Sequence, residues 1–272
     1  MARVVALYRY PVKGFTPEVC ETLTALPEGR VAGDRALGFR FADSAAQDFE
    51  WSRKHEFVAL ANTPGIARLA LKFDHEALRL RFSIGGVRLV EDALDSDGRA
   101  RIAAAIQGYV LDLGENPLAG HPERVPLRLV GDGRTPRYQD NAAGQITLHS
   151  RESLAAVAAA TSNHPEFDEL RFRSNIVIKG VRPWTELDWL GRKIRIGGTV
   201  FEVARRKTRC LATHANPRTG ERDLRVMMTL TRAFNQEEPT FAVGIVTSGP
   251  GGDIRIGDEV TVLPGEPSRS PG

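Results

Sequence analysis

Short runs of alternating apolar and polar residues, separated by turns rich in glycine and proline, are the main pattern along this chain of 272 residues. Period-two alternation predicts β-strands, and the first predicted strand covers residues 3–10 and stops at a proline. Other strand-like runs include 57–60, and two hairpins are predicted at 78–90 and 193–203, each around a Gly-Gly pair. Strands at this spacing indicate a small barrel or sandwich.

Apolar residues at helical spacing predict a helix over 99–110. A second helix is predicted over 151–160, directly after a strand at 145–150, with Ser150 as its N-cap. A helix N-terminus presents free N–H groups and the positive end of the helix dipole, so this corner has the outline of an anion site. Capping alone would explain Ser150 equally well.

A loop-like stretch at 114–126 predicts a boundary between two domains. We place the domains at 1–120 and 121–264, followed by a disordered tail at 265–272. The predicted fold class is mainly β with peripheral helices (α+β).

Composition indicates the general class of protein but does not identify a function. A hydrophobic share of 42% and a charged share of 26% are those of a soluble globular protein. A net charge of +3 fits an anionic ligand, a nucleic acid or nothing in particular. Since no stretch approaches the roughly 18 apolar residues of a membrane span and no signal-peptide core is present, we predict a cytoplasmic protein with no membrane association.

The chemistry-bearing residues exclude several kinds of site. Cys20 and Cys210 form no C-x-x-C pair, which excludes zinc ribbons and iron–sulfur clusters with four cysteine ligands. The six histidines are scattered singly, and neither a G-x-S-x-G nor an H-E-x-x-H motif occurs. Serine triads and zinc hydrolysis therefore lack support.

Cys210 follows a basic run that includes Arg205, Arg206, Lys207 and Arg209. Their positive potential would favour a thiolate, which is the form that acts as a nucleophile or binds soft metals. An Asn-Pro-Arg-Thr-Gly turn follows, so this cysteine is expected at a strand end or in a loop. The alternatives are a small buried cysteine and a solvated basic strand face.

The run 208–210, Thr-Arg-Cys, with Thr213 and the turn at 216–220, resembles the signature of the MOSC domain. This domain is the C-terminal domain of molybdenum cofactor sulfurases and of the mitochondrial amidoxime-reducing enzymes. The resemblance implies that Cys210 is the molybdenum ligand and the catalytic residue, and that Arg209 contacts the cofactor. Asn216 departs from the aspartate that many members carry.

Four further stretches resemble the same family. Tyr-Pro-Val-Lys-Gly at 10–14 resembles the opening of the MOSC N-terminal β-barrel domain, and Val-Ala-Gly-Asp-Arg at 31–35 resembles its Gly-x-Asp-Arg element. By resemblance, Lys13, Arg35 and Ser150 contact the cofactor phosphate, while Arg173 and Asn175 contact pterin or phosphate. From the residues alone, Lys13 could be an ordinary exposed lysine and Arg35 a partner of its neighbouring aspartate. A looser match at 51–54 is interpreted as structural.

The resemblance implies an N-terminal β-barrel domain packed on a MOSC β-barrel domain, with the molybdenum cofactor (Mo-molybdopterin) between them. It implies an oxidoreductase that reduces N-hydroxylated, or more broadly N-oxygenated, compounds. With two cysteines the chain cannot hold a four-cysteine cluster, so electrons are expected from a separate ferredoxin-like protein or flavin reductase, and no nucleic acid is expected as a partner. The alternatives are a non-catalytic cofactor carrier and a sulfur-transfer protein with a persulfide on Cys210.

Overall fold

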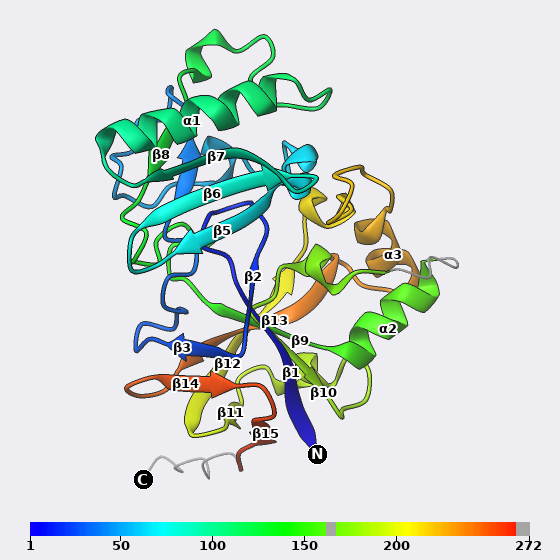
Figure 1. Cartoon of the computed structure of the whole chain (residues 1–272). Coiled ribbons are helices and arrows are strands. Elements are labelled where there is room, and N and C mark those ends of the chain that lie inside the picture. The colour runs from blue at the N-terminus through cyan, green and yellow to red at the C-terminus, as the bar shows by residue number, and fades with distance from the viewer. Residues whose placement is uncertain (162–166, 265–272) are drawn as a thin grey trace.

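The structure, a computed structural model, describes residues 1–161 and 167–264 (Figure 1). These ranges contain fifteen strands and three α-helices, so the predicted fold class, mainly β with peripheral helices, is confirmed. The predicted tail at 265–272 lies outside the described residues. In the described ranges, no helix combines the length and the apolar character that crossing a membrane requires.

Seven strands of the described chain close into a barrel in the order β1-β10-β9-β13-β12-β11-β15. The ring closes because β1 pairs with β10 on one side and with β15 on the other. All pairs in the ring are antiparallel except β9 with β10. The bounds are β1 Ala2–Arg9, β9 Ile146–Ser150, β10 Ile176–Lys179, β11 Lys193–Ile196, β12 Thr199–Thr208, β13 Thr240–Thr247 and β15 Glu259–Val262.

The strand that leads to Cys210 comes from the predicted hairpin at 193–203, which is confirmed as β11 and β12 joined at Gly197 and Gly198. Gly197 has φ of +54°, which a two-residue hairpin turn requires and glycine adopts readily. Beyond the predicted end, β12 continues to Thr208 against β13, with two irregularities in register. Such bulges re-aim side chains along a strand, here at its cavity end.

The rest of the first half builds a second core beside the barrel. Its strands are β4 Gly38–Arg40, β5 Ala70–Asp74, β6 Arg79–Ile84, β7 Val87–Ala93 and β8 Arg128–Val130. They form one sheet of β5, β6 and β7 and one of β4 and β8, and α1 (Ser96–Leu111) lies along both (Figure 1). The rings of Phe15, Phe39 and Phe82 meet in the core with centroids 5.1 to 5.9 Å apart.

Predictions for this half are partly right. The hairpin at 78–90 and the helix at 99–110 are confirmed as β6–β7 and α1. The strand at 57–60 is wrong: only Phe57 makes a single bridge, to Arg40, and the chain then turns. The four residues are buried because they pack under the sheets, and an apolar run can be buried without being a strand.

The first 31 residues contribute to both cores. Leu7, Leu23 and Val31 pack inside the barrel, whereas Val12 and Phe15 pack in the other core. Strand β2 (Glu18–Cys20) pairs with β1, and β3 (Thr22–Ala25) pairs with β14 (Gly252–Arg255) near the C-terminal strands. The boundary between residues 120 and 121 stays a prediction, but the strand that closes the barrel comes from the N-terminus.

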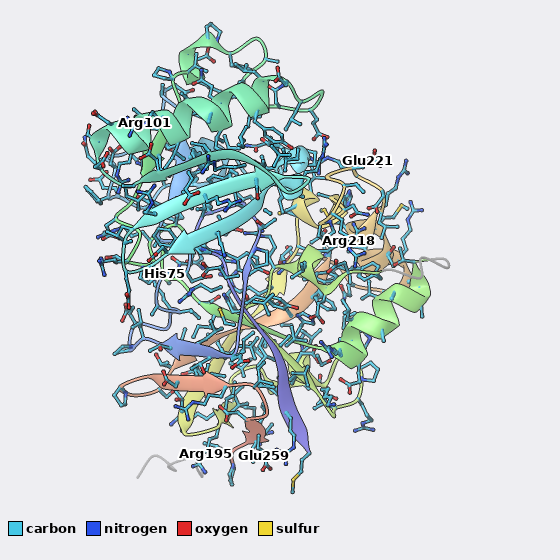
Figure 2. The ribbon with its side chains drawn as sticks, in the orientation of Figure 1. His75, Arg101, Arg195, Arg218, Glu221 and Glu259 are labelled. Carbon is cyan, nitrogen blue, oxygen red and sulfur yellow. The ribbon has the colours of Figure 1, made fainter. Side chains whose placement is uncertain are left out.

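Two helices cover the outside of the barrel. The predicted helix at 151–160 is confirmed as α2 (Arg151–Ala160), and α3 (Val226–Ala233) packs beside it over Phe172 and Phe241. Most charged side chains, such as Arg101 and Glu259, lie on the outside of the molecule (Figure 2). The buried charges are therefore exceptions, and several of them meet at one cavity.

Candidate functional site

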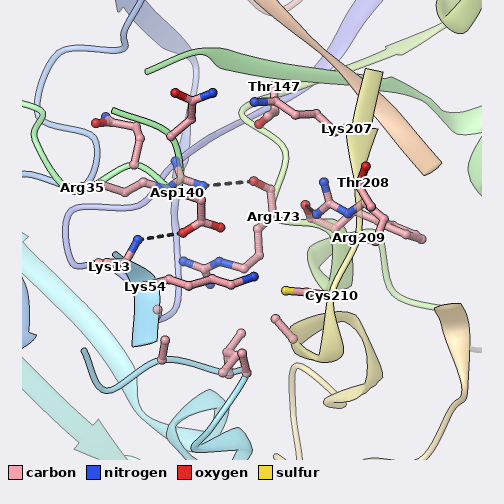
Figure 3. Close-up of a pocket in the computed structure, with 18 of the residues that line it drawn as sticks. Lys13, Arg35, Lys54, Asp140, Thr147, Arg173, Lys207, Thr208, Arg209 and Cys210 are labelled. Carbon is pink, nitrogen blue, oxygen red and sulfur yellow. Dashed lines mark hydrogen bonds and ion pairs between the residues drawn. The ribbon is translucent and has the colours of Figure 1, made fainter. Parts of the chain in front are cut away.

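A cavity of about 500 Å³ is lined by residues of both halves of the chain (Figure 3). The volume lies within the range of small-molecule sites. Its lining is rich in cations and has one acid and one cysteine among the described residues. The charged lining residues and the cysteine are Lys13, Arg35, Lys54, Asp140, Arg171, Arg173, Arg205, Lys207, Arg209 and Cys210.

Cys210 lies just after β12, as N-cap of the short 3-10 helix Leu211–His214, with its sulfur directed into the cavity (Figure 3). It is half-buried and not in a disulfide. Its carbonyl accepts hydrogen bonds from the backbone N–H (3.0 Å) and the hydroxyl (2.9 Å) of Thr213. Buried Arg171 donates to the carbonyls of residues 213–215 and pairs with Asp223 at 2.7 Å. The backbone that carries the thiol is thus held from both sides, as the predicted strand end requires.

Arg209, next to the cysteine, also lines the cavity. One of its terminal nitrogens donates to the carbonyl of Phe172, whose ring lies 5.6 Å from the guanidinium carbon. Its Nε is buried and has no hydrogen-bond partner in the described chain. Burial lowers the pKa of Arg209, with the nearby Cys210 opposing that shift. An unpaired buried N–H is unfavourable until an acceptor reaches it.

Arg35 and Arg173 lie on the ring of Tyr10, with guanidinium carbons 4.9 and 4.2 Å from the ring centroid. Arg173 donates to the carbonyl of Phe15 at 2.7 Å, but its Nη2 is buried and unpartnered in the described chain. Burial lowers the pKa of Arg173 to about 10. Both arginines have positive φ, 53° and 52°, which side-chain-bearing residues adopt at a cost of about 1–3 kcal/mol.

Asn175 stands behind this pair rather than in the cavity. Its amide donates to the carbonyl of Tyr8 and to Asp34, both at 3.1 Å, and its oxygen accepts from Thr147. The other oxygen of Asp34 pairs with Arg35. Although burial opposes the charged form, this carboxylate holds the pKa of Arg35 above its usual value. Asn175 therefore orients Arg35 through Asp34, and its predicted direct contact with pterin or phosphate has no support in the geometry.

Lys13 is 3% exposed, so the reading of an ordinary exposed lysine is wrong. Its ammonium donates to the carbonyl of Tyr138 at 2.8 Å and to the carboxylate of Asp140 at 2.7 Å. The attraction of Lys13 holds the pKa of Asp140 far below its usual value, whereas burial lowers the pKa of Lys13. The Asp140 side chain is 71% exposed and faces the cavity, so its negative charge lies next to the space that a ligand would occupy.

Ser150 is not part of the cavity lining. As predicted, it caps α2 by accepting from the N–H of Ser153 at 3.1 Å. Its hydroxyl also bonds to the Ser153 hydroxyl at 2.8 Å and to Glu186 at 3.0 Å, and it is fully buried. These contacts occupy the hydrogen-bonding groups of the Ser150 hydroxyl. The structure therefore supports the capping explanation and gives no support to a phosphate contact.

Sequence reasoning missed several lining residues. Trp51 and Lys54, interpreted as structural, line the cavity, and the indole N–H of Trp51 donates to the carbonyl of Gln139 at 2.8 Å. The loose family resemblance at 51–54 was the available signal. Asp140 and Gln145 belong to a loop before β9 that carries no motif we used, so nothing in the local pattern marked them.

Two departures from the family pattern have a physical reason. A Cβ on Gly14 would lie 2.8 Å from the Cα of Ala59, and Gly14 has φ of +87°, so serine would not fit without movement. Asn216 lies outside the cavity lining, where its oxygen accepts from the N–H of Arg218 at 2.8 Å and its amide donates to Asp223 at 2.7 Å. Its role is to shape the turn and to hold Asp223, the carboxylate that pairs with Arg171.

Fold and site together define a mainly β protein with a closed barrel and a cation-lined cavity that contains one cysteine. In the described residues, no group of three or more His, Cys, Asp and Glu side chains could hold a metal ion. The MOSC domain family matches residues 135–261. Residues 135–261 are therefore similar to the MOSC domain.

Three relatives are named molybdenum cofactor sulfurase. That of Anopheles gambiae is 39% identical over 126 residues, which cover 40% of this chain and 16% of that protein. That of Caenorhabditis briggsae is 35% identical over 92 residues, 33% of this chain and 13% of the relative. That of Caenorhabditis elegans is 36% identical over 75 residues, 28% and 10% respectively. The chain thus spans less than a fifth of each relative.

Two solved structures are similar at low scores. The YUAD protein from Bacillus subtilis matches with a TM-score of 0.41 and 12% identity, over 95% of this chain and 93% of that one. YiiM from Geobacillus stearothermophilus matches with a TM-score of 0.34 and 18% identity, over 50% and 67%.

Proposed function

We propose that the cavity binds the molybdenum cofactor, with Cys210 as the protein ligand of the metal. A thiolate is a soft ligand suited to a metal that is also held by sulfur. The MOSC domain and relatives named molybdenum cofactor sulfurase support this proposal. The observation that carries it is the meeting, in one cavity, of Cys210 with two unpartnered guanidinium N–H groups.

The donors fit the anionic end of such a cofactor. Arg173 Nη2 and Arg209 Nε are buried without acceptors in the described chain, and a phosphate offers several strong acceptor oxygens. Arg35 adds a guanidinium fixed by Asp34, and Lys13 adds a buried ammonium. We therefore assign Arg35, Arg173, Arg209 and Lys13 to the phosphate, and leave out Ser150 and Asn175, which do not line the cavity.

The activity we propose is the reduction of N-hydroxylated compounds to the parent amine or amide. When bound, the cofactor would supply oxygen-atom transfer at molybdenum, with electrons from a separate donor protein such as a ferredoxin-like protein or a flavin reductase. The chain's part is to fix one thiol, to hold the phosphate with cations, and to enclose the substrate against Leu60, Ala61 and Ala212 in the lining.

Two other functions are compatible with a cavity that has these cations and one cysteine. A carrier would bind the cofactor through the same cations and pass it to another protein. A sulfur-transfer protein would use Cys210 as a persulfide. Trp51 and the apolar lining beside Cys210 favour the enzyme, because they provide a wall for a substrate that a carrier does not need.

The experiment is metal analysis of protein purified from cells that make the cofactor, followed by reduction of a hydroxamic acid or an amidoxime. With a strong chemical reductant we expect turnover, and with NADH alone none, because no G-x-G-x-x-G turn is present in the sequence. Protein that contains molybdenum but reduces no N-hydroxy compound with any donor would support the carrier. Protein without molybdenum would contradict the proposal.

A further inference from the structure

A row of three cations follows β12 along one wall of the cavity. Arg205, Lys207 and Arg209 all line it, and Figure 3 shows Lys207 and Arg209 on this wall. Arg206 instead donates to the carbonyl of Leu187 at 3.2 Å and is not part of the lining. Arg205 and Lys207 are two residues apart on β12, where side chains share a face, and Arg209 follows directly after the end of the strand. Exposure rises from the half-buried Arg209 to the exposed Arg205, so the row leads outward from Cys210.

Arg205 and Lys207 lack the carboxylate partners that Lys13 and Arg35 have. Lys13 and Arg35 each pair with a carboxylate. Lys207 instead donates to the neutral amide oxygen of Gln145. In the described part of the chain, the side chain of Arg205 lines the cavity with neither a hydrogen bond nor an ion pair.

The side chain of Lys207 is held in position although other positive charges surround it. Burial, and then the charges of Arg205 and Arg209, lower the pKa of Lys207 to about 8. A Cβ on Gly244 of β13 would lie 2.7 Å from Cε of Lys207 and 2.4 Å from Oε1 of Gln145, so these side chains use the space that glycine leaves open. Like charges gathered in a partly buried cavity are unfavourable unless an anion joins them.

We infer that Arg205, Lys207 and Gln145 form a second anion subsite, which binds a further phosphate or carboxylate group beyond the single phosphate of the proposed cofactor. The inference rests on the proposed function, which assigns Lys13, Arg35, Arg173 and Arg209 to that single phosphate. The further group belongs either to the cofactor, as a second phosphate of a nucleotide-extended form, or to the substrate. Because Lys207 precedes Cys210 by three residues, about 10 Å along an extended chain, a substrate would have to span that length.

The first test uses cofactor-free full-length protein with orthophosphate and tripolyphosphate as probes in titration calorimetry. We expect Arg205→Gln with Lys207→Gln to weaken tripolyphosphate binding about tenfold, the loss of charge-assisted hydrogen bonds at a part-exposed site, and to change orthophosphate binding less than about twofold. The control is Arg206→Gln, which removes one positive charge from a neighbouring side chain outside the cavity and should change neither. Unchanged tripolyphosphate binding in the double variant, equal weakening of both anions, or no binding of tripolyphosphate by the wild type would each overturn the subsite.

The second test identifies the source of the group in cofactor-loaded protein. A nucleotide on the extracted cofactor, seen by mass spectrometry, points to the cofactor. A rise in KM for a carboxylate-bearing N-hydroxy substrate in Lys207→Gln, with the KM of its neutral analogue unchanged, points to the substrate. A monophosphate cofactor together with unchanged KM for both substrates would overturn the inference. Tripolyphosphate binding through Lys207 in a protein that takes up no molybdenum would contradict the proposed function and leave the subsite standing.

Discussion

The guanidinium of Arg35 donates a hydrogen bond of 3.4 Å to the carbonyl of Arg173, 138 residues further along the chain (Figure 3). Both guanidiniums lie on the ring of Tyr10. Both residues have the left-handed backbone that side-chain-bearing residues rarely adopt. Two strained cations on one aromatic ring bring like charges together, which an anion in the cavity would stabilise.

We therefore expect Arg35→Ala and Arg173→Ala to reduce cofactor retention. Each removes charge-assisted hydrogen bonds worth about 1.5–3 kcal/mol, or roughly ten- to hundredfold in affinity. Lys13→Ala should have a smaller effect, because its charge is already shared with Asp140. The measurement is molybdenum and pterin content after dialysis, and wild-type content in all three variants would contradict the phosphate assignment.

Asp140 competes for the anion site, because its exposed carboxylate lies in the cavity on the ammonium of Lys13. We expect Asp140→Asn to bind orthophosphate about tenfold more tightly, since one negative charge near the ligand is removed. Without phosphate the variant should melt at a lower temperature, because Lys13 is buried and loses its partner. Thermal unfolding with and without phosphate measures both effects, and a smaller phosphate-induced shift than in the wild type would contradict the competition.

Local sequence patterns predicted some parts of the fold and of the candidate site. Alternation and Gly-Gly turns located the β6–β7 and β11–β12 hairpins, and the motif at 208–210 located Cys210. The closure of the barrel by β1 depends on a pairing with β10 about 170 residues away, which no local pattern encodes. Asp140 and Gln145 reach the cavity by tertiary folding of a loop, and Ser150 looked like a ligand because a cap and an anion site share one local pattern.

Gly14 is required where the family carries serine. We expect Gly14→Ser to destabilise the protein by about 1–3 kcal/mol, through positive φ and through the close approach to Ala59. The matched control is Gly86→Ser, which has a similar φ of +83° but no atom within 4 Å of the added Cβ. Denaturant unfolding measures both, and equal losses would show that the contact with Ala59 has no effect.

His149 should make stability depend on pH. It is fully buried beside Phe241, both ring nitrogens lack partners in the described chain, and burial lowers its pKa to about 3. The unfolded chain therefore binds a proton between pH 6.5 and 3 that the folded protein does not, so stability falls as pH falls through this window. Between pH 7 and 5.5 the wild type should lose about 1 kcal/mol more than His149→Phe. Parallel urea-unfolding profiles of the two proteins would contradict this.

Cys210→Ser should abolish molybdenum-dependent activity while leaving phosphate binding intact. Serine keeps the size of the side chain but replaces a soft, acidic thiol with a hard hydroxyl that seldom ionises. The cations assigned to phosphate belong to other side chains, and in the described chain the thiol makes no hydrogen bond that the variant would lose. The variant should therefore fold, show a wild-type thermal shift with phosphate, and lack turnover of N-hydroxy compounds.

The control for this prediction is Cys20→Ser, which changes the only other cysteine of the sequence. Cys20 lies in β2 beside the barrel and is not part of the cavity lining, so its variant should keep both molybdenum and activity. Loss of activity in both variants would indicate a general effect of thiol removal. Wild-type turnover in Cys210→Ser would show that this cysteine is not the metal ligand, because an enzyme cannot lose its ligand and keep its rate.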